Sequence, residues 1–202
     1  MIANDYHDYV VKDGRMVGAF EEMYRHCADP WLQDAGPSVE EDVAVSLVRG
    51  SAYRRILDLG CGKGRFSDRI REATGAAVVA LDVAPTAISA GRARYPGVDF
   101  VAARVPPIPC CPGAFDLVVT SHLLWYVLPE LSSLFAEIRR TLAPTGRYLI
   151  VETFYHDGQQ RYGNDVMEKP EDLLGLLPFP VAQLVEVNRM TNYQIVALAD
   201  AV

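Results

Sequence analysis

The segment ILDLGCGKG, residues 56–64, joins a short apolar run to three alternating glycines. Residues 65–74 follow with Phe66, Ile70 and Ala73 at helical spacing, so the glycines form a turn between a strand and a helix. Because glycine has no side chain, the backbone can turn sharply there and a ligand can lie against the main chain. The segment therefore predicts a ligand-binding turn in an α/β fold.

Strand-like and helix-like patterns alternate on both sides of this turn. Short β-branched runs separated by amphipathic helices indicate parallel strands joined by right-handed crossovers. Strands are expected at 54–59, 77–81, 98–101, 116–120 and 147–154, and helices at 65–74, after Pro85, and from Leu131 to a stop at Pro144.

A further helix is expected before the first strand. Ser38 and Glu41 have the spacing of a capping box, and Val39, Val43 and Leu47 recur at intervals of four residues. This pattern predicts a helix that begins after Ser38 and buries these three side chains.

The last segments, 183–187 and 193–198, are separated by polar residues and predict an antiparallel hairpin at the edge of the sheet. The predicted fold class is therefore α/β, with a doubly wound, mostly parallel seven-stranded sheet and a C-terminal antiparallel hairpin.

The composition of the chain argues against several classes of partner and site. The 202 residues suit one domain, and 26 acidic against 19 basic residues leave a net charge of −7, which argues against nucleic-acid partners and basic membrane faces. No apolar run reaches the ~18–20 residues of a membrane span, and the N-terminus lacks a signal-peptide pattern, so a cytoplasmic protein is expected. The four cysteines form no C-x-x-C pair, so reduced thiols and no metal site are expected.

Two segments lie outside the alternation. Residues 1–37 contain a short helical pattern before Asp29-Pro30-Trp31, and residues 155–180 contain a helix opened by Pro170. Ligands of open α/β sheets bind beyond the carboxyl ends of the strands. We therefore expect 1–37 to cover the cofactor and substrate, and 155–180 to be a substrate-covering insertion within a Rossmann-like domain of residues 38–202.

The turn differs from the dinucleotide pattern G-x-G-x-x-G, because Arg65 stands where the third glycine is required. It also lacks the G-x-x-x-x-G-K-[ST] phosphate loop. Asp58, two positions before the first glycine, would repel a phosphate and attract a cationic ligand. A nicotinamide-dependent oxidoreductase of the same fold class is therefore the alternative rather than the first interpretation.

The motif D-x-G-x-G-x-G, carried by Asp58, Gly60, Gly62 and Gly64, resembles the first motif of class I S-adenosylmethionine-dependent methyltransferases. The resemblance extends over roughly residues 50–154. It implies that the enzyme uses S-adenosyl-L-methionine, with Asp82 accepting hydrogen bonds from the ribose and Val83 packing on the adenine. It also implies cofactor contacts from Cys61 and Ser121.

One segment departs from the family pattern. Arg104 stands where an aspartate often meets the adenine amino group, so either the Val105 backbone takes over that contact or Arg104 stacks on the ring. The sequence does not decide between these two alternatives.

Methyl transfer to an oxygen or nitrogen atom can require a base. His122 follows the fourth strand, beside the expected position of the methyl group, and Tyr126 and His156 are further candidates for catalysis. Glu152 lies within the fifth strand, where a structural role is the more common interpretation.

The segment 20–31 resembles the start of the nodulation-type N-methyltransferases, which act on glycan amines. The resemblance implies that Tyr24 and Trp31 contact the cofactor, although both could simply anchor the helix. We expect a small-molecule acceptor, with a sugar-containing one slightly favoured, and a monomer or homodimer. A non-catalytic module that binds the cofactor or its product is the second alternative.

Overall fold

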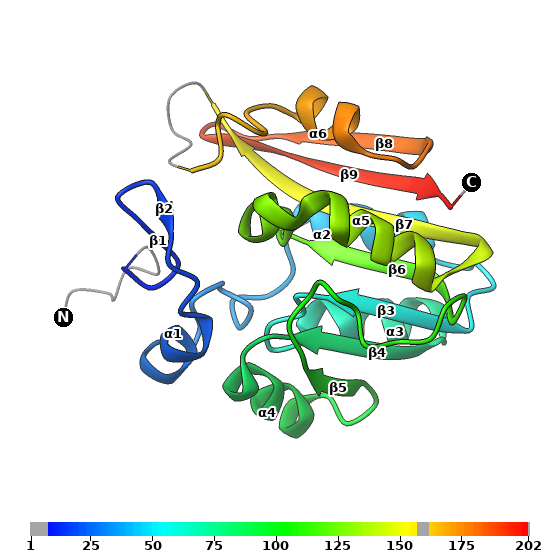
Figure 1. The fold of residues 1–202 in the computed structure, drawn as a ribbon. Helices are drawn as coiled ribbons and strands as arrows, with labels where there is room; N and C mark the ends of the chain where they lie inside the picture. Colours follow the sequence, from blue (N-terminus) through cyan, green and yellow to red (C-terminus); the bar gives the residue numbers. More distant parts are fainter. Residues whose placement is uncertain (1–7, 157–161, 202) are drawn as a thin grey trace.

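The structure is a computed structural model that describes residues 8–156 and 162–201. The calls on 1–37 and 155–180 therefore fall partly, at 1–7 and 157–161, outside the described residues. A seven-stranded sheet with strand order β5-β4-β3-β6-β7-β9-β8 forms the centre (Figure 1). Its strands are β3 (Arg55–Leu59), β4 (Ala77–Asp82), β5 (Asp99–Ala102), β6 (Phe115–Ser121), β7 (Leu142–Tyr155), β8 (Val181–Asn188) and β9 (Asn192–Asp200).

Strands β3 to β7 pair in parallel, and β9 pairs antiparallel with both β7 and β8. The chain therefore reverses once, at the C-terminal hairpin, as the polar residues between the last two strand patterns predict. The predicted doubly wound, mostly parallel seven-stranded sheet with a terminal antiparallel hairpin is confirmed.

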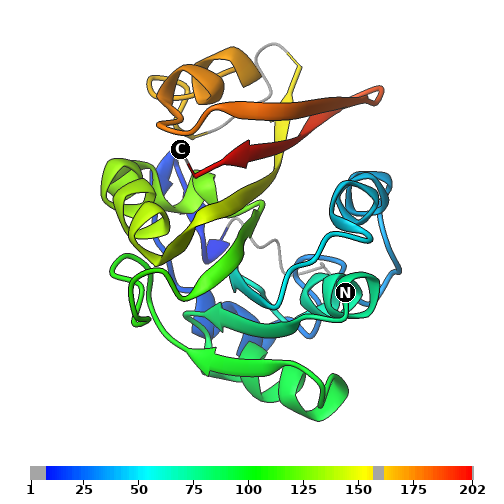
Figure 2. The same ribbon diagram turned by 90° about the vertical axis from the view of Figure 1, so that its right-hand side faces the viewer.

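Helices cover both faces of this sheet (Figure 2). One face packs against α2 (Val39–Val48), α3 (Arg65–Thr74) and α4 (Pro85–Arg94), and the other against the 3-10 helix η2 (Leu124–Glu130), α5 (Leu131–Thr141) and α6 (Pro170–Leu176). Central strands are consequently apolar on both sides, as Leu57 and Ile56 of β3 show by packing into opposite cores.

Helix α2 begins after Ser38 as predicted, and Val43 and Leu47 of its predicted apolar face pack, partly buried, against the core. Val39 is 54% exposed, whereas Ala44, Val45 and Val48 are buried. The capping box is half formed: the Glu41 N–H donates to Ser38 Oγ, but the Glu41 carboxylate turns to Arg65. The Glu41 carboxylate thus joins α2 to α3 instead of completing the cap of α2.

The segment 155–180 does not all lie at the carboxyl edge of the strands. Helix α6 lies beside β8 on the α5 face (Figure 1), and Leu173 and Phe179 are buried in the core of that face. Phe179 packs edge-on against Phe135 and Tyr148. This half of the segment is part of the core, because its apolar residues complete the layer over the antiparallel strands.

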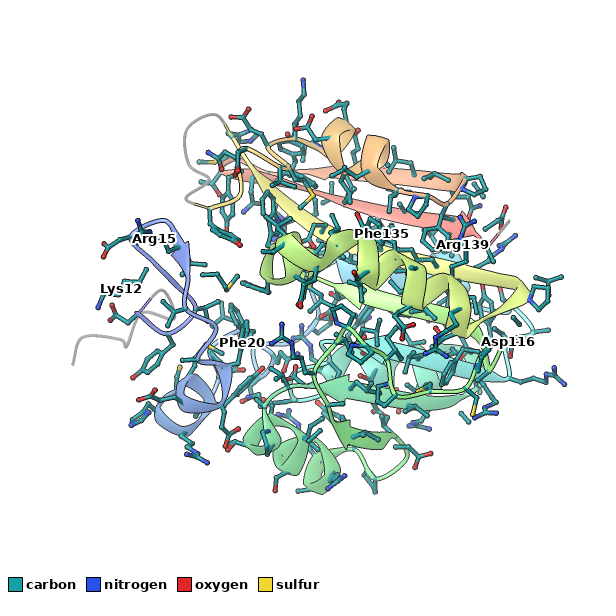
Figure 3. The ribbon with its side chains drawn as sticks, in the orientation of Figure 1. Lys12, Arg15, Phe20, Asp116, Phe135 and Arg139 are labelled. Carbon is teal, nitrogen blue, oxygen red and sulfur yellow. The ribbon has the colours of Figure 1, made fainter. Side chains whose placement is uncertain are left out.

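The N-terminal segment lies beyond the arrowheads of β3, β4 and β6 (Figure 1). It contains the hairpin β1 (Val11–Lys12) and β2 (Arg15–Met16) and the helix α1 (Phe20–His26). Figure 3 shows Phe20 between α1 and the rest of the molecule, with the hairpin's Lys12 and Arg15 pointing outward. The helix ends at His26, just before the Asp29-Pro30-Trp31 turn, as its sequence indicates.

No helix among the described residues is both long and apolar enough to span a bilayer. Over the same residues, no three His, Cys, Asp or Glu side chains gather as a metal site would require.

Candidate functional site

The glycine turn connects β3 to α3 at the carboxyl edge of the sheet. Gly60, Gly62 and Gly64 all have positive φ, at 72°, 57° and 83°, which other residues rarely adopt. The N–H groups of Gly60 and Cys61 donate to Leu81 O at 2.8 and 2.9 Å. The turn is thereby fixed to the end of β4.

Asp82 ends β4 and faces this turn. Its Oδ2 accepts the Gly62 N–H at 2.8 Å, and its Oδ1 accepts the Ala84 N–H at 2.9 Å. Burial raises the pKa of Asp82, although these backbone donors oppose the rise. The carboxylate thus joins the glycine turn to the start of α4, and the sequence could not distinguish this bridging role from capping alone.

Asp58 lies beneath the turn and is 2% exposed. Its Oδ2 accepts a hydrogen bond from Ser67 Oγ of α3 at 2.5 Å. Burial raises the pKa of Asp58 to about 7, despite this hydrogen bond. The side chain therefore points into the α3 face, and a direct contact with a ligand stays a prediction.

Gln33 covers the glycine turn. Its Oε1 accepts the Lys63 N–H at 2.6 Å, and its Nε2 donates to Cys61 O at 3.1 Å. A Cβ added to Gly62 would lie 2.7 Å from Gln33 Oε1, so glycine is required for this close approach. The N-terminal segment is thus hydrogen-bonded directly to the turn.

Lys63 holds the same segment through its side chain. Its Nζ lies 2.8 Å from Asp29 Oδ1 and 2.6 Å from Asp34 Oδ2, and it donates to Ala28 O. The Lys63 side chain is only 10% exposed. Burial lowers the pKa of Lys63, but the two aspartates outweigh it and the net shift is upward.

Tyr24 and Trp31 complete this cover. Tyr24 is 7% exposed, and its hydroxyl oxygen has no hydrogen-bond partner among the described residues. That oxygen would lie 2.8 Å from a Cβ at Gly62. Trp31 packs against Tyr126, which also meets Phe20 edge-on. Of the two residues predicted to contact the cofactor, Tyr24 therefore lies beside the glycine turn, and Trp31 packs against Tyr126 of η2.

His122 and Glu152 meet at the carboxyl ends of β6 and β7. His122 has φ +54°, and its Nδ1 lies 3.7 Å from Glu152 Oε1. The Glu152 side chain is completely buried, whereas that of His122 is 39% exposed. A half-exposed imidazole backed by a buried carboxylate can take up or release a proton at this edge.

Residues 56–146 match a family model described as a methyltransferase domain. This segment is a class I S-adenosylmethionine-dependent methyltransferase domain. It runs from β3, through the glycine turn, to Gly146 within β7. The match covers the predicted motif residues in the order in which they were expected.

Relatives support the same assignment for this part of the chain. An uncharacterised methyltransferase of Synechocystis is 33% identical over 103 residues, which are 50% of this chain and 48% of that protein. A demethylmenaquinone methyltransferase of Renibacterium salmoninarum is 35% identical over 113 residues, covering 56% and 45%. This chain thus matches about half of the length of these relatives.

Solved structures share the fold at low identity. The N-methyltransferase NodS of Bradyrhizobium japonicum, in complex with S-adenosyl-L-homocysteine, has a TM-score of 0.72 at 19% identity and covers 90% of this chain and 97% of that one. A geranyl diphosphate C-methyltransferase of Streptomyces coelicolor has a TM-score of 0.65 at 16% identity, covering 81% and 75%. The methyltransferase fold therefore extends into the flanking segments.

Four further residues predicted to contact the cofactor lie outside the glycine turn. Val83 lies next to Asp82 and is 46% exposed, and Ser121 ends β6 beside His122. Val105 is buried in the α5-face core, and the exposed Arg104 pairs with Glu130 at 2.7 Å. Neither observation chooses between the two alternatives for the adenine contact.

Two of the three candidate bases are engaged elsewhere. Tyr126 packs among the aromatic rings of the cover. His156 Nε2 lies 3.0 Å from Arg189 O, and its ring lies against Tyr193. His122 is therefore the candidate with the clearest catalytic geometry in the methyltransferase domain.

Sequence reasoning missed Gln33 and Lys63 and undervalued Glu152. Gln33 and Lys63 are 30 residues apart, and no motif joins them. Glu152 carried one usable signal: a carboxylate near the end of an otherwise apolar central strand is costly to bury, so its presence there indicates a partner.

Proposed function

We propose that this protein is a methyltransferase that binds S-adenosyl-L-methionine and methylates a nitrogen or oxygen atom of a small molecule. The observation that carries the proposal is the Gly62 N–H to Asp82 hydrogen bond, which places a carboxylate beside a glycine turn in a methyltransferase domain. The cofactor would supply a methyl group activated by a positively charged sulfur.

The residues of this edge fit such a cofactor. Asp82, which ends β4 beside the glycine turn, would accept hydrogen bonds from the ribose hydroxyls, and the half-exposed Val83 would pack on the adenine. The unpartnered Tyr24 hydroxyl faces Gly62, where the methionine end would lie. Gln33 and Lys63 hold the N-terminal segment against the glycine turn, where it would shield the methyl group from water.

The net charge of this protein and the names of its relatives both favour a small-molecule acceptor. The net charge of −7 disfavours nucleic acid, and relatives of the domain include enzymes named for trans-aconitate and demethylmenaquinone. The fold neighbours include N- and C-methyltransferases. Four expectations stay predictions: a sugar-containing acceptor, a cytoplasmic location, a monomeric or homodimeric state, and a substrate-covering role for the segment 155–180.

Calorimetry with S-adenosyl-L-methionine tests the cofactor. We expect saturable binding, and we expect Asp82→Ala to weaken it at least about tenfold, because the ribose loses charge-assisted hydrogen bonds. Asp99→Ala, which removes an exposed carboxylate of β5 away from the turn, is the matched control and should bind like the wild type. A flat titration of folded protein would refute the proposal, and binding of NADH instead would favour the oxidoreductase alternative.

Turnover separates an enzyme from a binding module. Transfer of labelled methyl groups to a panel of phenols, amino sugars, alkylamines and carboxylic acids should mark at least one class of acceptor. Saturable cofactor binding without transfer to any member would favour the non-catalytic alternative.

A further inference from the structure

His122 is held in an unusual backbone conformation at the end of β6. Its φ of +54° is uncommon for a residue with a side chain, and such positions gather at functional sites because the surrounding structure must enforce them. Its N–H donates to Val151 O at 2.8 Å, which fixes the residue to β7. The imidazole is thereby fixed between the ends of the two strands.

Glu152 is the buried group behind this imidazole. Its side chain is 0% exposed, and its two oxygens accept the N–H groups of Leu124 and Thr153, each at 3.1 Å. Among the ion pairs of the described residues, Glu152 takes part only in the one with His122. A buried carboxylate is costly unless its charge is balanced, and the two backbone donors leave His122 as the ionisable partner of Glu152 in this part of the structure.

The Nδ1 nitrogen of the His122 ring lies beside two side-chain oxygens of β7. Nδ1 lies 3.2 Å from Thr153 Oγ1 and 3.7 Å from Glu152 Oε1. A proton on Nδ1 is stabilised by these oxygens, and the tautomer with Nδ1–H leaves a lone pair on Nε2. The His122 side chain is 39% exposed, so part of it lies at the surface of the molecule.

We propose that Glu152 is a positioning residue that keeps His122 in the Nδ1–H tautomer, so that Nε2 removes a proton from the acceptor. The substrate class is then a hydroxyl compound or an amine, because a carboxylate has no proton to lose. The inference rests on the proposed function and selects the acceptor chemistry of the same site.

In the proposed methyl transfer, the acceptor gains a methyl group and loses a proton. A lone pair of the acceptor oxygen or nitrogen forms the bond to the methyl carbon while the carbon–sulfur bond breaks. The electron pair of that bond stays on sulfur, which loses its positive charge. The acceptor's proton passes to His122 Nε2, and Glu152 stabilises the imidazolium that results.

The charges around His122 support this role. Burial acts to lower the pKa of His122, but the nearby Glu152 carboxylate, together with Glu40 and Glu41 of α2, raises it above its ordinary value. The two α2 carboxylates are themselves ion-paired, with Arg189, Arg65 and Arg69. Methyl transfer should therefore become faster as pH rises through the pKa of His122 and the imidazole loses its proton.

Nitrogen-detected NMR of the full chain measures the tautomer and the pKa of His122 without an acceptor. We expect the Nδ1–H tautomer in the wild type, and in Glu152→Gln a lower pKa and a loss of that tautomer preference. Glu40→Gln is the matched control: it removes a nearby charge but leaves the Nδ1 contacts, so the tautomer should stay. An unchanged tautomer and pKa in Glu152→Gln would overturn the inference.

Turnover with the acceptors found by the panel tests the substrate class. His122→Asn should reduce transfer to a hydroxyl or amine by about 100-fold or more, and Glu152→Gln by at least about tenfold with a shifted pH profile. Calorimetry should show unaltered cofactor binding in both variants, so a failure here is distinct from a failure of the proposed function. Transfer confined to carboxylic acids, and indifferent to His122→Asn, would refute the inference.

Discussion

At the scale of single residues, Gly64 of the glycine motif is required by packing. Gly64 has φ +83°, and a Cβ there would collide with the Phe100 ring, which also meets Gly91. The third glycine is thus needed where α3, α4 and β5 converge. Its role is to let the first turn of α3 approach the sheet.

Gly64→Ala should therefore destabilise the protein more than an alanine at another left-handed glycine. Gly75 has φ +73° with no heavy atom within 4 Å of an added Cβ, so it supplies the matched control. We expect a loss of roughly 2–4 kcal/mol for Gly64→Ala, from strain plus overpacking, and about 1 kcal/mol for Gly75→Ala. Urea denaturation measures both, and equal losses would show that Phe100 yields to the methyl group.

Asp58 makes stability depend on pH. Its pKa of about 7 in the folded protein exceeds the ordinary value of 3.8, so the folded state binds this proton more tightly than the unfolded state. The stabilising contribution is present below the ordinary value and is lost as pH rises through about 7.

Asp58→Asn should remove this dependence. At pH 8 the variant is expected to be more stable than the wild type by an amount on the order of 1–3 kcal/mol, and at pH 4 the difference should shrink. Urea midpoints between pH 4 and pH 8 provide the measurement, with Asp99→Asn as an exposed control. Parallel pH profiles for the wild type and Asp58→Asn would contradict the assignment.

At the scale of elements, the cover formed by residues 20–36 is held to the methyltransferase domain mainly by polar contacts. Lys63 joins the glycine turn to Asp29 and Asp34, Arg94 of α4 also pairs with Asp34, and Glu21 of α1 accepts hydrogen bonds from Thr86. These polar contacts are supplemented by the aromatic group of Phe20, Trp31 and Tyr126. Such a segment can open locally without unfolding the sheet.

Lys63→Met should loosen the cover alone. The variant keeps the apolar stem but leaves two aspartates without their ammonium partner, so residues 20–36 should exchange their amide hydrogens several-fold faster. Helix α5, on the opposite face, should be unaffected. Hydrogen exchange followed by mass spectrometry distinguishes this outcome from a global loss of stability, in which both segments would change together.

At the scale of the whole molecule, the C-terminal hairpin is part of the core. Strand β9 lies between β7 and β8, and its residues Ile195 to Ala199 are completely buried. Ile195 and Leu198 face opposite layers of helices. Because one strand contributes to both layers, the two cores should unfold as a unit.

Leu198→Ala tests this coupling. The substitution creates a cavity on the α2 face and should cost about 2–5 kcal/mol. In a Trp31→Phe background, fluorescence reports Trp125 on the opposite face, and its transition should move together with that of the circular dichroism signal. Separate midpoints for the two signals would show that the layers unfold independently.

The alternation of strands and helices, the order of the motifs and the glycine turn could be predicted from the sequence. Periodicity and glycine content are local properties, so ILDLGCGKG indicated its strand, turn and helix without knowledge of the rest of the chain. The same local rules predicted where α2 begins. They did not predict that the Glu41 carboxylate contacts Arg65 or that Val39 is exposed.

Only the tertiary structure decided which side chains meet at the site. Gln33 reaches Lys63, and His122 reaches Glu152, across about 30 residues of chain in each case. No period or motif encodes such pairs, because strand order and helix rotation bring them together only after the sheet has formed. The sequence determined that a glycine turn joins β3 to α3, and the packing of distant strands and of residues 20–36 determined what surrounds that turn.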